Sequence, residues 1–204
     1  MNDYIKKISI LTTFIGCWAY AYAEPVNIIT TQSKTAAAAI NKDKDKDEDV
    51  KKTVLGIMSY TRWIPPPTPV NFCIVAAKHA AALEHLDSLA PNIVANTTPS
   101  STATAENRIV ISKPDYDAAK LSAQCDVIYF GNISPADQQK VIATRQNHPI
   151  LTISEDNDCE IGSSFCLQTT SSPITFLVNL DSLTRSGVRV DPNVLLLGKK
   201  RTSP

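Results

Sequence analysis

The stretch CDVIYFG at residues 125–131 is short and almost continuously apolar. Such a run is typical of a strand that is covered on both faces within a parallel sheet. A second run of this kind, NFCIVAA, occupies residues 71–77. Helix-like segments separate these runs and follow them, so strands and helices alternate along the chain. This alternation predicts an α/β fold with a mainly parallel sheet flanked by helices.

The remaining elements extend this pattern toward both ends of the chain. Apolar residues at helical spacing predict a helix over residues 49–63, and the prolines that follow it prevent its continuation. Ser134, followed by proline and then by an acidic residue in the first turn, is a typical helix start. Residues 165–169 and 174–179 predict a C-terminal hairpin. We also expect strands at 108–112 and 150–153, and helices at 80–89, 117–123 and 182–186, the last capped by Asp181 and ended by Gly187.

The composition is that of a globular protein. The chain has 204 residues, and its 20 Lys and Arg residues balance its 20 Asp and Glu residues. Balanced charge argues against a nucleic-acid-binding protein, so we expect no nucleic-acid partner. Hydrophobic residues make up 43% of the chain, which is enough for a sizeable core.

The first 23 residues have the organisation of a cleavable signal peptide. Two lysines precede an apolar stretch over residues 8–18, and residues 21–23 form an A-x-A cleavage site. The pattern predicts a protein that is exported to the periplasm and cleaved before Glu24. In an alternative interpretation, Gly16-Cys17 is a lipoprotein cleavage site that leaves Cys17 as an acylated N-terminus. No later stretch approaches 18 consecutive apolar residues, so we expect no membrane span after cleavage.

Residues 24–49 are predicted to form a flexible, charged linker. They contain a run of alanines and then KDKDKDED at residues 42–49, with almost no large apolar side chain. A segment of this composition buries too little apolar surface to form a core. The helical pattern that begins at Val50 marks the start of a single domain over residues 50–200.

Removal of a signal peptide leaves four cysteines, Cys73, Cys125, Cys159 and Cys166. An even number in an exported protein predicts two intrachain disulfides, although four cysteines allow three pairings. Spacing favours Cys159 with Cys166, because the six residues between them include Gly162 and can turn back. Cys73 and Cys125 remain, each near the start of a predicted strand, where a bridge is geometrically plausible. Four buried, reduced thiols are the alternative.

The chain lacks the common motifs of enzymes. It has no G-x-S-x-G elbow, no phosphate-binding P-loop and no G-x-G-x-x-G, and it contains six glycines in total. His79, His85 and His148 do not have the spacing of metal ligands. We therefore predict no catalytic residue, no metal and no cofactor, and a protein that is not an enzyme.

Four stretches together resemble the YfiR family of periplasmic repressors, in particular its enterobacterial branch. They are residues 54–63 before the proline run, 125–132, 159–167 with its Cys-x6-Cys loop, and the closing segment 176–192. The resemblance covers residues 50–200. The charged linker and the Thr/Ser-rich insert near residues 97–105 look longer than the family needs. Leu177 stands where many relatives carry an acidic residue.

The resemblance implies a function as well as a fold. It implies a periplasmic α/β protein that binds the periplasmic sensor domain of an inner-membrane diguanylate cyclase and represses cyclic di-GMP synthesis. Biofilm and exopolysaccharide production are restrained as a result. An outer-membrane-associated lipoprotein is the antagonist that the family implies. The resemblance also implies a homodimer and the pairings Cys73 with Cys125 and Cys159 with Cys166.

Tyr60, Arg62 and Trp63 are the candidate partner-binding residues, because Trp and Arg are favoured anchors of interfaces. Alternatively, Trp63 completes the core face of the preceding helix. A second function class is a periplasmic small-ligand binding module, with a pocket beyond the carboxyl ends of the parallel strands. An unrecognised hydrolase would need a catalytic base that the sequence does not reveal.

Overall fold

The structure is a computed structural model, and it describes residues 29–86, 109–156 and 159–198. The signal peptide predicted over residues 1–23, the alternative cleavage site at Gly16-Cys17 and the insert near residues 97–105 lie outside these ranges. Two compact units are distinguished, Met1–Ala37 and Ala38–Pro204. The first unit contains the beginning of helix α1 (Ile29–Ser59), and the second contains the sheet and both disulfides.

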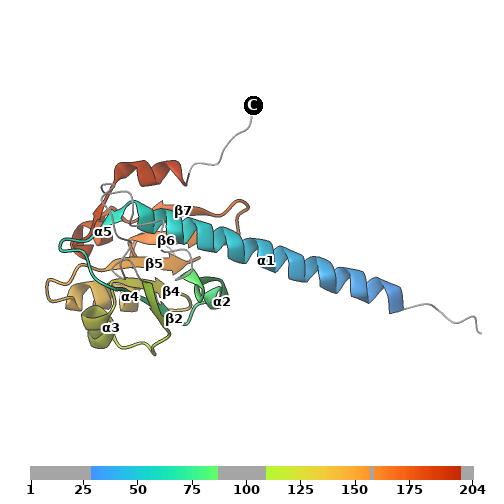
Figure 1. The fold of residues 1–204 in the computed structure, drawn as a ribbon, viewed down its shortest axis with the longest axis horizontal. Helices are drawn as coiled ribbons and strands as arrows, with labels where there is room; N and C mark the ends of the chain where they lie inside the picture. The colour runs from blue at the N-terminus through green and yellow to red at the C-terminus, as the bar shows by residue number, and fades with distance from the viewer. Residues whose placement is uncertain (1–28, 87–108, 157–158, 199–204) are drawn as a thin grey trace, which may run out of the picture. The chain divides into compact units, whose positions relative to one another are not determined.

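A six-stranded sheet forms the centre of the second unit, with the strand order β3-β2-β4-β5-β6-β7 (Figure 1). The four pairings from β3 to β6 are parallel, and β6 with β7 is antiparallel. This arrangement confirms the predicted α/β fold with a C-terminal hairpin. The strands are β2 (Val70–Val75), β3 (Ile109–Ser112), β4 (Val127–Phe130), β5 (Leu151–Glu155), β6 (Phe165–Gln168) and β7 (Thr175–Val178).

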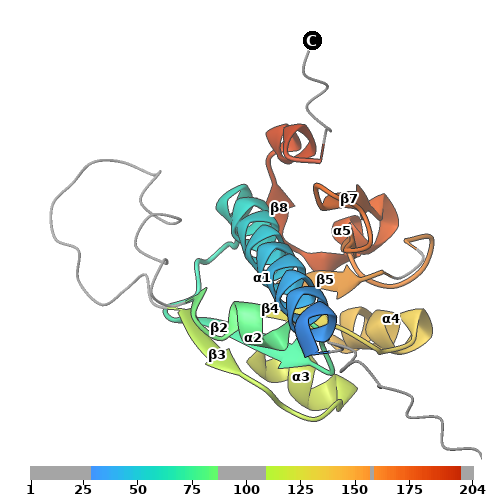
Figure 2. The same ribbon diagram turned by 90° about the vertical axis from the view of Figure 1, so that its right-hand side faces the viewer.

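Helices cover both faces of the sheet. One face packs against the C-terminal half of α1, which contributes Val54 and Ile57 to the larger core cluster. The other face packs against α3 through Leu121 and against α4 through Val141. Figures 1 and 2 show α3 and α4 on the side of the sheet away from α1. The helices are α2 (Ala80–Leu83), α3 (Ala118–Gln124), α4 (Pro135–Thr144), α5 (Leu180–Ser186) and the 3-10 helix η3 (Pro192–Leu196).

The start of α1 lies earlier than the sequence predicts, within the residues 24–49 that were expected to form a linker. The helix begins at Ile29 instead of near residue 49. The predicted linker contains no glycine or proline after this point, and its alanine, lysine and glutamate residues are good helix formers. Two contacts stabilise residues 47–52 of α1. Lys52 forms an i,i+4 ion pair with Glu48 at 3.9 Å, and Asp47 Oδ1 lies 2.7 Å from His79 Nδ1. The domain boundary predicted near residue 50 stays a prediction.

The end of α1 differs from the prediction as well. The helix stops at Ser59, where the predicted helix continued to residue 63. Thr61 and Arg62 form the short strand β1 (Thr61–Arg62), which pairs antiparallel with β8 (Arg189–Val190). This pairing competes with helix continuation before the prolines are reached, and a local sequence pattern does not reveal it.

The ends of β2 and β4 meet at Gly131. The Gly131 N–H donates to the Val75 carbonyl at 2.9 Å, and the Asn132 N–H donates to the Ala76 carbonyl at 3.0 Å. A Cβ atom at Gly131 would overlap the backbone of Ala76 and Ala77. Close approach of two backbones, and not a positive φ angle, therefore requires glycine at this position.

Both predicted disulfides are present. Cys73 on β2 bonds to Cys125, which stands two residues before β4, with Cα atoms 5.9 Å apart and both residues buried. Cys159 bonds to Cys166 on β6, with Cα atoms 5.7 Å apart. The first bridge ties together two adjacent parallel strands, and the second closes a short loop.

Removing the two bridges should lower stability to different degrees. We expect Cys73→Ser with Cys125→Ser to lower the free energy of unfolding by about 4 kcal/mol, the loop-closure entropy for a bridge that spans 52 positions. Cys159→Ser with Cys166→Ser, which spans 7 positions, should cost about 2.5 kcal/mol. Urea denaturation of the two double variants and the parent protein measures both losses. A smaller loss for the Cys73–Cys125 pair than for the other pair would contradict this account.

Candidate functional site

The three predicted partner-binding residues follow the end of α1. Tyr60 and Trp63 are partly buried and pack against the core on the α1 side. Arg62 is exposed, and its guanidinium donates to the carbonyls of Ser59 at 2.7 Å and Thr61 at 2.8 Å. Tyr60 and Trp63 therefore both pack against the core, although Trp63 lies beyond the end of α1 and is not part of that helix, and Arg62 is exposed.

Arg62 has a second cation directly opposite it. In the ladder between β1 and β8, Arg62 pairs with Arg189, and both side chains are exposed. Like charges in directly opposed positions of an antiparallel pair are unfavourable. An anionic group placed over this pair would relieve the repulsion.

Trp63 also borders a surface cleft of about 400 Å³. The cleft lies at the edge of the sheet where β4 and β5 begin. Apolar side chains dominate its lining, and a carboxylate and an imidazole are the ionisable groups in it. The lining residues are Trp63, Pro65, Pro66, Pro67, Asp126, Gln146, Asn147, His148 and Pro149.

The two ionisable residues of this cleft contact each other. His148 Nε2 lies 3.2 Å from Asp126 Oδ1 and 3.2 Å from the carbonyl oxygen of Cys125. The other carboxylate oxygen of Asp126 accepts from the Asn71 N–H at 2.7 Å, and the Trp63 indole N–H donates to the Asp126 carbonyl at 3.3 Å. Asp126 thus connects the beginning of β2, the Trp63 side of the cleft and the imidazole of His148.

Burial raises the pKa of Asp126 above its ordinary value of 3.8, and the Asn71 N–H and the nearby His148 act in the opposite direction. The Asp126 side chain is only 3% exposed, whereas that of His148 is 36% exposed. A burial penalty on the charged carboxylate therefore outweighs the groups that stabilise its charge. The partly exposed imidazole is the part of this pair that an approaching molecule can reach.

The sequence pattern assigned no partner to His148, so its contact with Asp126 was not predicted. A signal for it exists, however, because each residue stands shortly before a parallel strand. Asp126 directly precedes β4, and His148 stands three positions before β5. Neighbouring parallel strands begin at the same edge of a sheet, which brings residues before them together.

The loop closed by Cys159 and Cys166 is a second candidate site, and buried hydrogen bonds hold it in position. Gln138 of α4 is fully buried, and its side-chain oxygen accepts from the Ser163 N–H at 3.1 Å and from the Ser163 hydroxyl at 2.7 Å. Its amide nitrogen donates to the carbonyl of Ile133 at 2.8 Å. Glu160 and Ile161, at the tip of the loop, are exposed.

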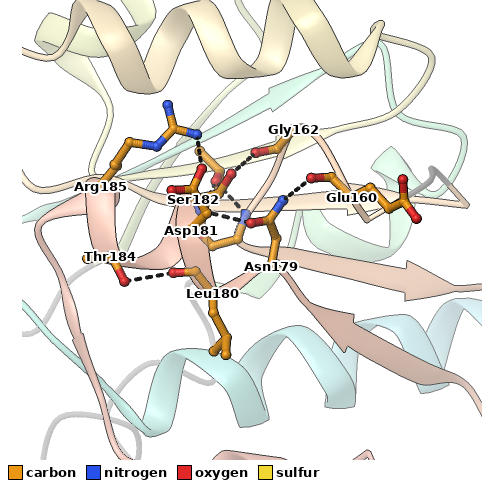
Figure 3. A network of polar contacts seen from close by, with 10 residues as sticks. Glu160, Gly162, Asn179, Leu180, Asp181, Ser182, Thr184 and Arg185 are labelled. Atoms are coloured by element: carbon orange, nitrogen blue, oxygen red, sulfur yellow. Dashed lines mark hydrogen bonds and ion pairs between the residues drawn. The ribbon is translucent and has the colours of Figure 1, made fainter.

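The beginning of α5 holds the same loop from the other side, as Figure 3 shows. The Asn179 side chain donates to the Glu160 carbonyl at 3.1 Å, and the Ser182 hydroxyl donates to the Gly162 carbonyl at 2.6 Å. Asn179 also accepts from the Ser182 N–H at 2.9 Å, so it caps α5 in place of the predicted Asp181. Asp181 forms an i,i+4 ion pair with Arg185 at 2.6 Å instead.

The described part of the chain holds neither a metal-binding cluster nor a membrane-spanning helix. In it, no cluster of three or more His, Cys, Asp or Glu side chains is arranged to hold a metal ion. Among its helices, none combines the length and the apolar composition required to cross a bilayer.

The fold and these two features define a disulfide-bonded α/β protein with an aromatic- and proline-lined surface cleft. A comparison with known protein families identifies its kind more closely. Residues 49–199, well over half of the chain, match the family described as YfiR/HmsC-like. The chain belongs to this family, as the resemblance predicted; its assignment to an enterobacterial branch stays a prediction.

The buried carboxyl of Asp126 should make the stability of the folded protein depend on pH. We expect it to titrate with a pKa above 3.8, and His148→Gln to raise this pKa further because a neighbouring positive charge is lost. Since the pKa is higher in the folded than in the unfolded chain, the carboxyl lowers stability as the pH rises from 3.8 through the native pKa. Carbon NMR of the carboxyl group measures the titration.

Asp126→Asn is the control for the stability effect. This variant keeps an acceptor for the Asn71 N–H and cannot ionise, so it should lack the loss of stability over that pH range. A pKa at or below 3.8 for Asp126 in the parent protein would contradict the dominance of burial.

Proposed function

We propose that this protein is a periplasmic negative regulator that binds the periplasmic sensor domain of an inner-membrane diguanylate cyclase. Binding represses cyclic di-GMP synthesis and hence biofilm and exopolysaccharide production. The observation that carries the proposal is membership of the YfiR/HmsC-like family over residues 49–199. The protein acts by binding, without catalytic residues, cofactor or nucleic acid.

The two disulfides support a periplasmic location. Such bonds persist in oxidising compartments such as the periplasm and are rare in the reducing cytosol. The signal peptide predicted over residues 1–23 supplies the route of export, and residues 24–49 then connect it to the domain at 50–200.

The surface around β1 supports a binding role for Arg62 and Trp63. Arg62 and Arg189 form a cationic pair, and Trp63 forms a wall of the apolar cleft. This combination suits a partner that presents an acidic group beside an apolar side chain. Tyr60, which is partly buried beside them, supports this surface from the core. The regulator holds the cyclase inactive if it binds the inactive sensor conformation more tightly than the active one.

Two further interactions belong to the proposal. An outer-membrane-associated lipoprotein is the antagonist that sequesters the regulator, and the regulator itself is a homodimer. Both come from the family, and neither requires a catalytic group.

The cleft favours a second candidate function, a small-ligand binding module. Its volume of about 400 Å³ and its lining of tryptophan, prolines and an accessible imidazole suit a small molecule. The cleft lies where β4 and β5 begin, whereas the pocket predicted from the sequence lies beyond the carboxyl ends of the strands, at the opposite edge. Pull-down with purified cyclase sensor domain, without added ligand, separates protein binding from ligand binding.

The first test of the proposal is cellular cyclic di-GMP in a strain that lacks the gene. Deletion should raise it, and only the exported form should restore the original level on complementation. A form lacking residues 1–23 is the matched control, because it retains the domain and remains in the cytoplasm. Unchanged cyclic di-GMP after deletion would reject repression and favour the ligand-binding alternative.

The partner surface is tested by charge reversal. Arg62→Glu should weaken binding to the cyclase sensor domain at least tenfold, a loss of about 1.4 kcal/mol, because the cationic pair with Arg189 is broken. Lys52→Glu is the control, since it reverses an exposed cation on α1. Titration calorimetry measures both affinities, and equal effects of the two substitutions would contradict a specific role for Arg62.

A further inference from the structure

β7 is the terminal strand of the six-stranded sheet, so among the described residues one of its edges has no strand beside it. The chain carries no charge from Pro173 to Leu180. Leu177 is 54% exposed on this strand. Its neighbour Phe176 is buried and packs edge-to-face on Phe165, with ring centroids 5.6 Å apart, which holds the strand in position. An uncharged, unpaired edge strand is a template for pairing with another strand.

The hydrogen bonds to β6 determine which backbone groups of β7 point outward. The Asn179 N–H donates to the Ser164 carbonyl at 3.0 Å, and Leu177 lies opposite Cys166. Residues that face the neighbouring strand alternate with residues that face away from it in an antiparallel pair. Leu177, two positions from Asn179, therefore faces β6 with its backbone groups.

Phe176 and Val178 consequently direct their N–H and C=O groups away from β6. No hydrogen bond within the described ranges uses these four groups. They form a short row of two donors and two acceptors at the open edge of the sheet.

We propose that two copies of this chain associate through β7, antiparallel, about a two-fold axis at Leu177. Phe176 of one copy then lies opposite Val178 of the other, and the outward groups form four backbone hydrogen bonds. Leu177 meets the same residue of the second copy in a non-hydrogen-bonded pair, where opposed side chains are closest. The two six-stranded sheets join into one sheet of twelve strands.

A second copy fits this edge for three reasons. Antiparallel pairing about a two-fold axis is self-complementary, so each copy supplies the donors and acceptors that the other lacks. The uncharged strand brings no like charges together when it meets itself. Association also buries the exposed apolar surface of the two Leu177 side chains. At the other edge, β3 is followed directly by Lys113, which pairs with Glu84, and flanking charges of this kind discourage strand addition.

This interface rests on the homodimer in the proposed function and adds the surface that forms it. Size-exclusion chromatography with light scattering, over a dilution series of the purified exported protein, should give twice the mass of one chain. Leu177→Lys and Leu177→Glu should each weaken dimerisation at least tenfold, because like charges then face each other across the axis. An equimolar mixture of the two variants should restore the double mass.

Val110→Lys is the matched control, because Val110 is an exposed apolar residue on β3, the opposite edge strand. This variant should remain dimeric, and circular dichroism verifies that each variant is folded. Hydrogen exchange gives an independent readout, since the Phe176 and Val178 amides should be protected in the dimer and should exchange faster on dilution.

A parent protein with the mass of one chain at every concentration would overturn the proposal. So would Leu177 variants that dimerise as well as the parent, or fast exchange of the Phe176 and Val178 amides in the dimer. Failure of the proposed function is distinguished by cellular cyclic di-GMP after gene deletion, because deletion removes the protein whatever its oligomeric state.

Discussion

The parallel pairing of β2 with β4 is the constraint on which the other features depend. It sets Phe72 opposite Val127, and two connections reinforce it where β4 begins: the Cys73–Cys125 bridge and the bond from the Asn71 N–H to the Asp126 carboxylate. The same carboxylate contacts the imidazole in the cleft. The core of the sheet and the wall of the cleft are therefore one connected structure, and a change in strand register would displace both.

The sequence was sufficient where local patterns determine the structure. Continuous apolar runs identified β2 and β4, Ser134 identified the start of α4, and cysteine spacing favoured the pairing of Cys159 with Cys166. Each of these signals depends on residues close together in the chain. The resemblance to the YfiR family added the expectation of function, which no local pattern contains.

The sequence was insufficient where distant segments decide the outcome. The early start of α1 is accompanied by the contact of Asp47 with His79, and its early end by the pairing of β1 with β8. The cap of α5 is Asn179, whose side chain also holds the disulfide loop, although Asp181 is an equally good cap by residue type. The contact of Asp126 with His148 likewise appears only when adjacent strand starts are placed side by side.

Gly131 affects which edge of the sheet a ligand can reach. Its backbone is pressed against that of Ala76 and Ala77, so main-chain atoms fill the space between the far ends of β2 and β4. Many α/β proteins admit their ligands at this crevice. Here the crevice is closed at that point by the chain itself, and the cleft that Trp63 borders lies at the opposite edge of the sheet, where β4 and β5 begin. The cleft of this protein therefore lies at the amino ends of the parallel strands, opposite the edge at which such sheets usually bind ligands.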